Sequence, residues 1–235
     1  MNKKVLIVIC IISLVCNLTL AVLLVNTNRV NTQNNKIKEA LTKKQKKKDY
    51  SKENIVFLGD SITDWCPFDA LYDKDIPIIN SGRAGYRTFS ILEEMDDLVY
   101  KYNPTKVFIL IGTNDLNTHT GKDQLVNNIE KMIKGIKKHR PNCKIYVESI
   151  YPVNKTDKDK IDMDKVSERE NDEIKEVNAR IKNVCKKQKV KYINVYKHLV
   201  DDEGNLTLEY TKDGLHLSDL GYLKVTKVLT PYVEE

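Results

Sequence analysis

Four short polar blocks hold the residues whose types and spacing could do chemistry. They are GDSIT at 59–63, NSGRAG at 80–85, GTND at 112–115 and DGLH at 213–216. Ser61 offers a hydroxyl that becomes a nucleophile only when a base removes its proton. His216 is the expected base, and Asp213 is expected to hold its other ring nitrogen. The backbone N–H groups of Ser61 and Gly82 and the side-chain amide of Asn114 would donate to a tetrahedral oxyanion, so the blocks predict acyl transfer.

These blocks adjoin the elements that would position them. Short apolar runs predict five strands, at residues 55–58, 76–79, 106–111, 144–150 and 190–195. Apolar residues at helical spacing predict four helices, at residues 89–102, 122–139, 167–188 and 217–232. This alternation is typical of a doubly wound α/β domain with a parallel sheet. With the strand order 2-1-3-4-5, the first three blocks meet at one rim of the sheet, and the fourth reaches that rim from beyond the last strand.

Each block taken alone has a simpler interpretation. A serine after a strand can be the N-cap of a helix, and glycine-containing blocks are common in turns between strands and helices. A lone aspartate three residues before a histidine is a weaker signal still. The blocks favour catalysis only in conjunction, because they occur in this order and each lies at a predicted strand end or helix start.

With these blocks the chain resembles the SGNH hydrolases, also called GDSL lipases or acylhydrolases, over residues 53–234. The family is named for a serine, a glycine, an asparagine and a histidine. They are matched here by Ser61, Gly82, Asn114 and His216, and Asp213 matches the family's acid. The resemblance implies a flavodoxin-like three-layer α/β/α sandwich with a five-stranded parallel sheet, and ester hydrolysis without a metal or other cofactor. It does not identify the ester, because the family acts on lipid, glycan and small-molecule esters.

Four further residues near these blocks are candidates for substrate contact: Trp65, Tyr86, Arg87 and His119. The first three lie just beyond the first two blocks, and the fourth follows Asn114 by five residues. Asp60 and Asp115, the acids beside Ser61 and Asn114, are expected to brace their loops by hydrogen bonds rather than to react.

The domain's cysteines and its polar insertion carry weaker signals. Cys66, Cys143 and Cys185 are odd in number and share no metal-like spacing, so we expect neither a disulfide framework nor a metal site. Residues 154–170 form a long charged insertion after the fourth predicted strand. We interpret it as a solvated loop, with the alternative that it covers the site, because it follows the C-terminal end of a strand.

The positive charge of the chain is concentrated at its N-terminus. Residues 1–50 hold 10 Lys and Arg against 2 acids, a net charge of +8. Residues 51–235 hold 29 against 31, a net charge of −2, which gives +6 for the whole chain. A nucleic-acid-binding domain would carry its own basic excess, so we expect no nucleic-acid partner.

An uncharged apolar run at residues 5–25 predicts an N-terminal transmembrane helix, because about 20 residues span a bilayer. A cleaved signal peptide is the alternative, but no Ala-x-Ala-like site follows the run. We expect a signal anchor at 1–25, a Lys- and Asn-rich stalk at 26–50 and the esterase domain at 51–235, outside the cell.

Three functions remain open at this point. The first is a membrane-tethered serine esterase that hydrolyses small acyl esters, such as O-acetyl groups on surface glycans. The second is a lysophospholipase-type lipid esterase, and the third is a surface module that binds glycans without catalysis. The intact Ser-His-Asp set favours an enzyme, because a binding module needs no general base. The oligomeric state is not predicted.

Overall fold

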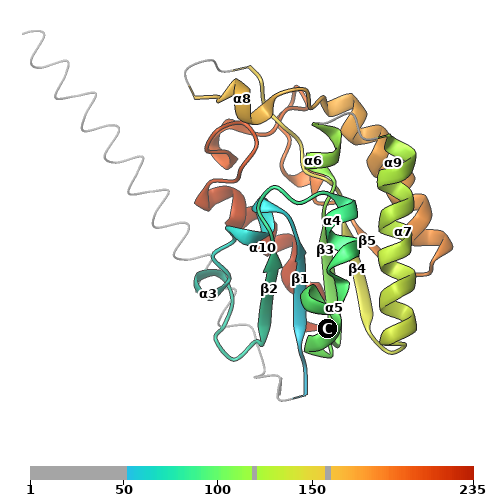
Figure 1. The fold of residues 1–235 in the computed structure, drawn as a ribbon. Coiled ribbons are helices and arrows are strands. Elements are labelled where there is room, and N and C mark those ends of the chain that lie inside the picture. Colours follow the sequence, from blue (N-terminus) through green and yellow to red (C-terminus); the bar gives the residue numbers. More distant parts are fainter. Residues whose placement is uncertain (1–51, 118–120, 157–159) are drawn as a thin grey trace, which may run out of the picture. The chain divides into compact units, whose positions relative to one another are not determined.

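One parallel sheet forms the centre of the part of the chain that the structure describes. The computed structural model describes residues 52–117, 121–156 and 160–235. Within these residues five strands lie in the order β2-β1-β3-β4-β5, and each neighbouring pair is parallel (Figure 1). Their bounds are β1 Ile55–Gly59, β2 Ile78–Gly82, β3 Lys106–Leu110, β4 Lys144–Glu148 and β5 Lys191–Ile193. The predicted order is confirmed, and the topological switch point lies between β1 and β3.

The second strand differs from its prediction. It begins two residues later, at Ile78, and runs through Gly82, so the NSG block ends the strand instead of following it. Pro77 has no N–H to donate to the ladder, although its carbonyl still accepts from the backbone of Ile55 at 3.0 Å. This explains why pairing through β2 starts only after the proline.

Short and long helices alternate with the strands. Their bounds are α2 Ser61–Asp64, α3 Phe68–Leu71, α4 Thr88–Glu93, α5 Met95–Leu98, α6 Thr113–Leu116, α7 Lys122–His139, α8 Met163–Val166, α9 Asn171–Lys187 and α10 Asp219–Glu234. Three single 3-10 turns lie at Tyr100–Tyr102, Tyr196–His198 and Leu208–Tyr210. The helix predicted at 122–139 is confirmed, whereas the one predicted at 89–102 is divided into α4, α5 and the first 3-10 turn.

Helices cover both faces of the sheet, as expected for a three-layer sandwich. Val56, Leu58 and Ile109 point to one face, where they pack with buried residues of α4, α5, α7 and α9. Phe57 and Phe108 point to the other face, where they pack with α10 and with side chains near α2 and α3. The strand side chains are buried on both faces, which is why the strands appear in the sequence as continuous apolar runs.

The N-terminal predictions lie outside the described residues. The expected anchor at 1–25 and the stalk at 26–50 fall in residues 1–51, of which the structure gives no description. Among the described helices, none combines the length and the apolar character needed to cross a bilayer.

Candidate active site

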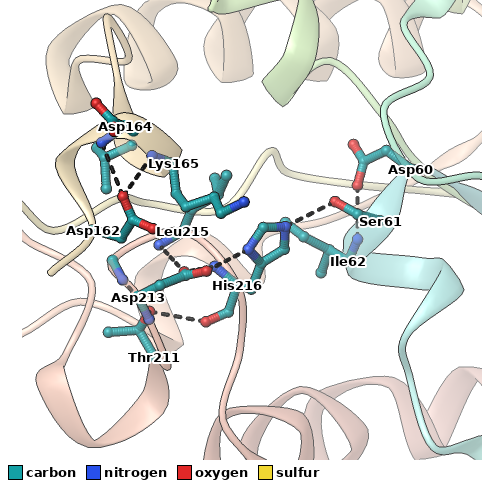
Figure 2. Close-up of polar contacts among 12 residues, drawn as sticks. Asp60, Ser61, Ile62, Asp162, Asp164, Lys165, Thr211, Asp213, Leu215 and His216 are labelled. Atoms are coloured by element: carbon teal, nitrogen blue, oxygen red, sulfur yellow. Dashed lines mark hydrogen bonds and ion pairs between the residues drawn. The ribbon is translucent and has the colours of Figure 1, made fainter. Parts of the chain in front are cut away.

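Ser61, His216 and Asp213 form a continuous chain of polar contacts at the C-terminal rim of the sheet (Figure 2). Ser61 is the first residue of α2, directly beyond β1, and its Oγ lies 3.1 Å from His216 Nε2. On the other side of the ring, His216 Nδ1 lies 2.7 Å from Asp213 Oδ2. Ser61 and His216 are each 6% exposed, so both residues are largely shielded from water. The predicted trio is therefore brought together, although its catalytic role stays a prediction.

The contacts define how the imidazole must be protonated. An ionised carboxylate only accepts hydrogen bonds, so the hydrogen of neutral His216 lies on Nδ1 and points to Asp213. Nε2 then carries a lone pair facing the Ser61 hydroxyl, which is the arrangement a general base needs. Partial burial raises the pKa of Asp213. The hydrogen bonds from the His216 ring and from the backbone N–H groups of His216 and Leu215 outweigh that effect and lower the pKa to about 2.

The D-x-x-H turn owes its shape to a few local contacts. Thr211 Oγ1 donates to the carbonyl of His216 at 2.9 Å and accepts from Gly214 N–H at 2.7 Å, which closes the turn. Gly214 has a φ of +93°, a conformation that side chains rarely adopt. A Cβ on Gly214 would also lie 2.5 Å from the carbonyl oxygen of Asn154. A glycine between the acid and the base therefore lets the insertion pack directly beneath the turn.

On the nucleophile side, Asp60 caps the helix that begins at Ser61. Its Oδ1 accepts from the backbone N–H of Ile62 at 3.0 Å, so the aspartate braces the loop as expected. Burial raises the pKa of Asp60 to about 7, although the Ile62 N–H and the positive charge of Arg169 act in the opposite direction. Asp115 also has a bracing role, because it accepts from the backbone N–H and the hydroxyl of Thr88 at the start of α4.

The three predicted oxyanion donors differ in the hydrogen bonds that they make in this structure. The Ser61 N–H lies in the first turn of α2, where a helix supplies no carbonyl to accept it. The Gly82 N–H donates to Asn80 Oδ1 at 2.9 Å. It can therefore donate to a substrate oxygen only after the hydrogen bond to Asn80 breaks. Asn114 Nδ2 donates to the carbonyl of Tyr86 at 3.0 Å, which uses one of the two hydrogens of the amide. The oxyanion hole remains a prediction with this geometry.

Gly82 is needed for a reason that the sequence did not indicate. A Cβ at this position would lie 2.1 Å from the backbone nitrogen of Asp64 in α2. The glycine therefore permits β2 to pack against the helix of the nucleophile. Asn80 Nδ2 adds a hydrogen bond to the Asp64 carbonyl at 3.0 Å, across the same contact.

Among the candidates for substrate contact, Trp65 has the clearest position. Its side chain is 52% exposed, and the centroid of its indole lies 4.3 Å from that of the His216 ring. Tyr86 is turned toward the junction between α4 and α5, because its hydroxyl donates to Glu94 at 2.8 Å. The Arg87 guanidinium lies 5.6 Å from the ring centroid of Phe89. His119 is not among the described residues.

The remaining sequence predictions concern metals and thiols. Within the described ranges, no three His, Cys, Asp or Glu side chains gather in a way that could hold a metal ion. Cys66, Cys143 and Cys185 are free thiols. Burial raises the pKa of the Cys66 thiol far above its ordinary value, so this cysteine close to Ser61 is not an activated nucleophile.

One buried residue of the site was missed from the sequence. Arg169 was expected to lie in a solvated insertion, but it is 2% exposed and its Nη2 donates to Asn114 Oδ1 at 2.9 Å. Its Nε donates to the carbonyl and hydroxyl oxygens of Thr113, both at 2.9 Å. A weak signal existed, since Arg169 is the single arginine in an insertion that holds four lysines, and the forked guanidinium suits buried carbonyl groups better than an ammonium does.

Comparisons with solved structures agree with this fold. A platelet activating factor structure from Streptococcus pneumonia is 32% identical, has a TM-score of 0.73, and covers 92% of this chain and 99% of its own. A GDSL-like lipase from Bacteroides thetaiotaomicron is 23% identical, with a TM-score of 0.69 and coverages of 89% and 97%. An acetyl xylan esterase is 21% identical, with a TM-score of 0.63 and coverages of 77% and 99%. The last two support the fold alone.

Comparisons of sequence identify the family. An N-acylneuraminate cytidylyltransferase from Escherichia coli is 30% identical over 175 residues, which are 73% of this chain. The chain spans only 38% of the length of that relative. The GDSL-like Lipase/Acylhydrolase family matches residues 57–224, a range that contains Ser61, Gly82, Asn114, Asp213 and His216. The chain therefore belongs to the GDSL-like lipase/acylhydrolase family, a family of carboxylic ester hydrolases.

Proposed function

We propose that this protein is a membrane-tethered serine esterase that removes small acyl groups, of the O-acetyl kind, from glycans outside the cell. The observation that carries the proposal is the chain of contacts from Ser61 Oγ through His216 to Asp213, at 3.1 and 2.7 Å. A protein that only binds esters would have no use for a base held in this tautomer. The geometry therefore favours catalysis over the binding module.

In the proposed reaction, Ser61 Oγ attacks the ester carbonyl carbon while its proton passes to His216 Nε2. Asp213 stabilises the imidazolium that forms, and it can do so because its own pKa is lowered to about 2. The negative oxygen of the tetrahedral intermediate is bound by N–H groups at Ser61, Gly82 and Asn114. Collapse of the intermediate breaks the ester bond, and the departing alkoxide takes the proton from Nε2. Water then repeats these steps, releasing the acid and restoring Ser61.

Two observations support a carbohydrate as the alcohol part of the ester. Trp65 presents an exposed indole beside His216, and an aromatic face of this kind offers an apolar platform on which a sugar ring can stack. Two similar proteins also carry carbohydrate names, the acetyl xylan esterase and the N-acylneuraminate cytidylyltransferase. These names support only a carbohydrate as the alcohol part of the ester. Cytidylyl transfer is not part of the proposal.

The membrane tether is supported by the sequence alone. Residues 5–25 are uncharged, and Lys3 and Lys4 precede them directly, whereas Arg29 is the only basic residue among the ten that follow. Seven further lysines between positions 36 and 48 reduce this difference in positive charge. The residues next to the span favour an N-in orientation with the catalytic domain outside, because basic residues remain preferentially on the cytoplasmic side.

A substrate series tests the activity. The full-length protein and its Ser61→Ala variant are assayed on p-nitrophenyl esters from acetate to decanoate, on acetylated sugars and on a lysophospholipid. We expect kcat/KM to be highest for acetate and acetylated sugars, with no turnover by the variant. A preference for decanoate or the lysophospholipid would replace the proposal with the lipid esterase. Equal rates from both proteins would reject the serine mechanism.

Protease treatment of intact cells tests the topology. A protease outside the cell should degrade the domain at 51–235 without prior lysis, while a cytoplasmic control protein stays intact. Protection of the domain until the cells are lysed would overturn the extracellular placement and leave the esterase mechanism untouched.

A further inference from the structure

The side chain of Arg169 joins the insertion at 154–170 to the candidate oxyanion donor. All three guanidinium nitrogens are engaged: Nε with Thr113, Nη2 with Asn114, and Nη1 with the carbonyls of Lys165 and Val166 at 2.9 and 3.0 Å. The last two carbonyls belong to α8, within the insertion, whereas Thr113 and Asn114 belong to α6, beyond β3. The arginine therefore connects two segments that lie more than 50 residues apart in the sequence.

These contacts determine which way the Asn114 amide points. A guanidinium only donates hydrogen bonds, so the atom of Asn114 that faces Arg169 must be the oxygen. A backbone carbonyl only accepts, so the atom that faces the Tyr86 carbonyl must be the nitrogen. Rotating the amide by half a turn would place donor against donor and acceptor against acceptor. Without Arg169, half of this constraint is lost.

The charge of Arg169 also acts on the amide electronically. Hydrogen bonds that involve an ionised partner are shorter and stronger than neutral ones. Drawing electron density toward Oδ1 leaves the Nδ2 hydrogens more positive, and a more positive donor binds an oxyanion more strongly. Orientation and polarisation therefore favour the same state, in which Asn114 donates to negative charge.

The insertion contacts the other end of the site as well. The backbone N–H of Asp162 donates to the carbonyl of Asp213 at 3.0 Å, and that of Asn154 donates to the carbonyl of Gly214 at 2.9 Å. One segment thus braces the turn that holds the triad acid and, through Arg169, the amide on α6. Figure 2 shows Asp162 beside the turn of Asp213 and His216.

We propose that Arg169 is a positioning residue for ester hydrolysis, which holds and polarises the Asn114 amide so that its nitrogen faces the oxyanion. This inference rests on the oxyanion role proposed for Asn114. It assigns the 154–170 insertion a part in catalysis, with the effect on the transition state and little effect on binding of the ground-state ester.

A double-mutant cycle tests the proposal in the full-length protein. Asn114→Ala, Arg169→Met and the double variant are assayed for kcat and KM on p-nitrophenyl acetate. Removing one oxyanion donor costs on the order of 10²–10³ in kcat, and we expect Arg169→Met to lose at least ~10-fold with KM changed by less than ~3-fold. The double variant should be no slower than Asn114→Ala, because Arg169 acts only through that side chain.

The outcomes separate the two roles. If the losses multiply in the double variant, Arg169 acts independently of Asn114 and the inference falls. If Asn114→Ala keeps the parental kcat, the oxyanion role of Asn114 falls instead. Should Arg169→Met fail to fold, Arg169→Lys enters the same cycle, since an ammonium keeps the charge but lacks the fork that reaches three partners.

A matched variant controls for general loosening of the insertion. Lys155→Met removes the ion pair between Lys155 Nζ and Glu170 Oε1, at 2.5 Å, near the two ends of the insertion, and leaves Arg169 and its partners in place. Glu170 is exposed, and an exposed ion pair contributes about 0–1 kcal/mol of stability. We expect at most a small drop in melting temperature, with the parental kcat. A drop in kcat as large as that of Arg169→Met would show that the attachment of the insertion, and not the bond to Asn114, limits turnover.

Discussion

Two regions of this molecule hold a carboxyl group away from bulk water and shift its pKa in opposite directions. In the catalytic turn, Asp213 accepts from the His216 ring and from two backbone N–H groups, and its pKa is lowered to about 2. Between the sheet and α10, Glu148 accepts from the Tyr151 hydroxyl at 2.6 Å, and burial raises its pKa to about 7. The Asp213 side chain is 21% exposed, whereas Glu148 is 4% exposed.

The difference shows that N–H donors, together with residual access to water, decide which acid stays ionised. Asp60 supports this interpretation, because it is 1% exposed, accepts from the Ile62 N–H, and has a pKa raised to about 7. An acid that must stabilise an imidazolium has to be ionised beforehand. The D-x-x-H spacing meets this need within one turn, since the same short segment supplies the ring and the backbone donors.

The largest expected effect on kcat comes from removing the nucleophile Ser61 or the base His216, the two side chains whose chemistry depends on Asp213. Ser61→Ala and His216→Ala should each lower kcat by on the order of 10⁶, and the double variant should be little worse than either. The effects of substituting residues that act together are strongly non-additive, because His216 has no proton to accept once Ser61 is gone, and Ser61 has no base once His216 is gone. Steady-state kinetics on p-nitrophenyl acetate measure this, and multiplied losses in the double variant would contradict a shared mechanism.

The next effect compares the same chemical change in the two regions. Asp213→Asn should lower kcat by on the order of 10⁴, because an amide can no longer select the His216 tautomer that leaves Nε2 free to accept a proton. Glu148→Gln, the matched control, should keep kcat close to that of the parent. Equal losses from the two amides would show that both carboxyls support the fold and that neither is specific to catalysis.

Much of this arrangement could be predicted from the sequence, because strong local patterns carried it. Continuous apolar runs predicted the buried parallel strands. Three blocks at strand ends and a fourth before the last helix predicted which side chains would meet. The boundary between α4 and α5 could not be predicted, because Ile91 and Met95 keep helical spacing across it and face the same core. Spacing reports which face is buried and does not report a break in the helix.

Arg169 could not be predicted for a different reason. Its surroundings in the sequence are charged and polar, which is typical of a solvated loop. Its partners, Thr113 and Asn114, lie 56 and 55 residues away and become visible only in the folded structure. Gly82 illustrates the same limit, since its importance for packing depends on a backbone contact with α2.

A smaller effect concerns stability and is measured at Glu148, in the apolar region. Between pH 4.5, the ordinary pKa of glutamate, and about 7, folded Glu148 keeps a proton that the unfolded chain has released. Stability therefore falls as pH rises through this range, by roughly 3 kcal/mol at about 1.4 kcal/mol for each pKa unit. Glu148→Gln should remove this share of the fall, measured by urea unfolding at pH 5 and pH 8.

Three other carboxyls must be considered in that measurement. Burial raises the pKa of Asp60 to about 7 and also raises the pKa of Asp115, and both contribute a fall of the same sign, so the variant should keep a residual pH dependence. Asp213 contributes stability that is lost only as pH falls from 3.8 toward 2, outside the range tested. An unchanged pH dependence in Glu148→Gln would mean that this carboxyl is ionised in the folded protein at neutral pH.

The smallest expected effect on stability comes from the Tyr151 hydroxyl, the donor that contacts Glu148. Tyr151→Phe removes the hydroxyl that donates to Oε2, and this bond is strongest when the carboxylate is charged. At pH 8, above the pKa of about 7, Glu148 is ionised in the folded protein. The substitution should therefore destabilise the protein by about 1 kcal/mol more at pH 8 than at pH 5. In a Glu148→Gln background this difference should vanish, because a neutral amide presents the same acceptor at both pH values. A difference that persists in that background would assign the pH dependence to another group.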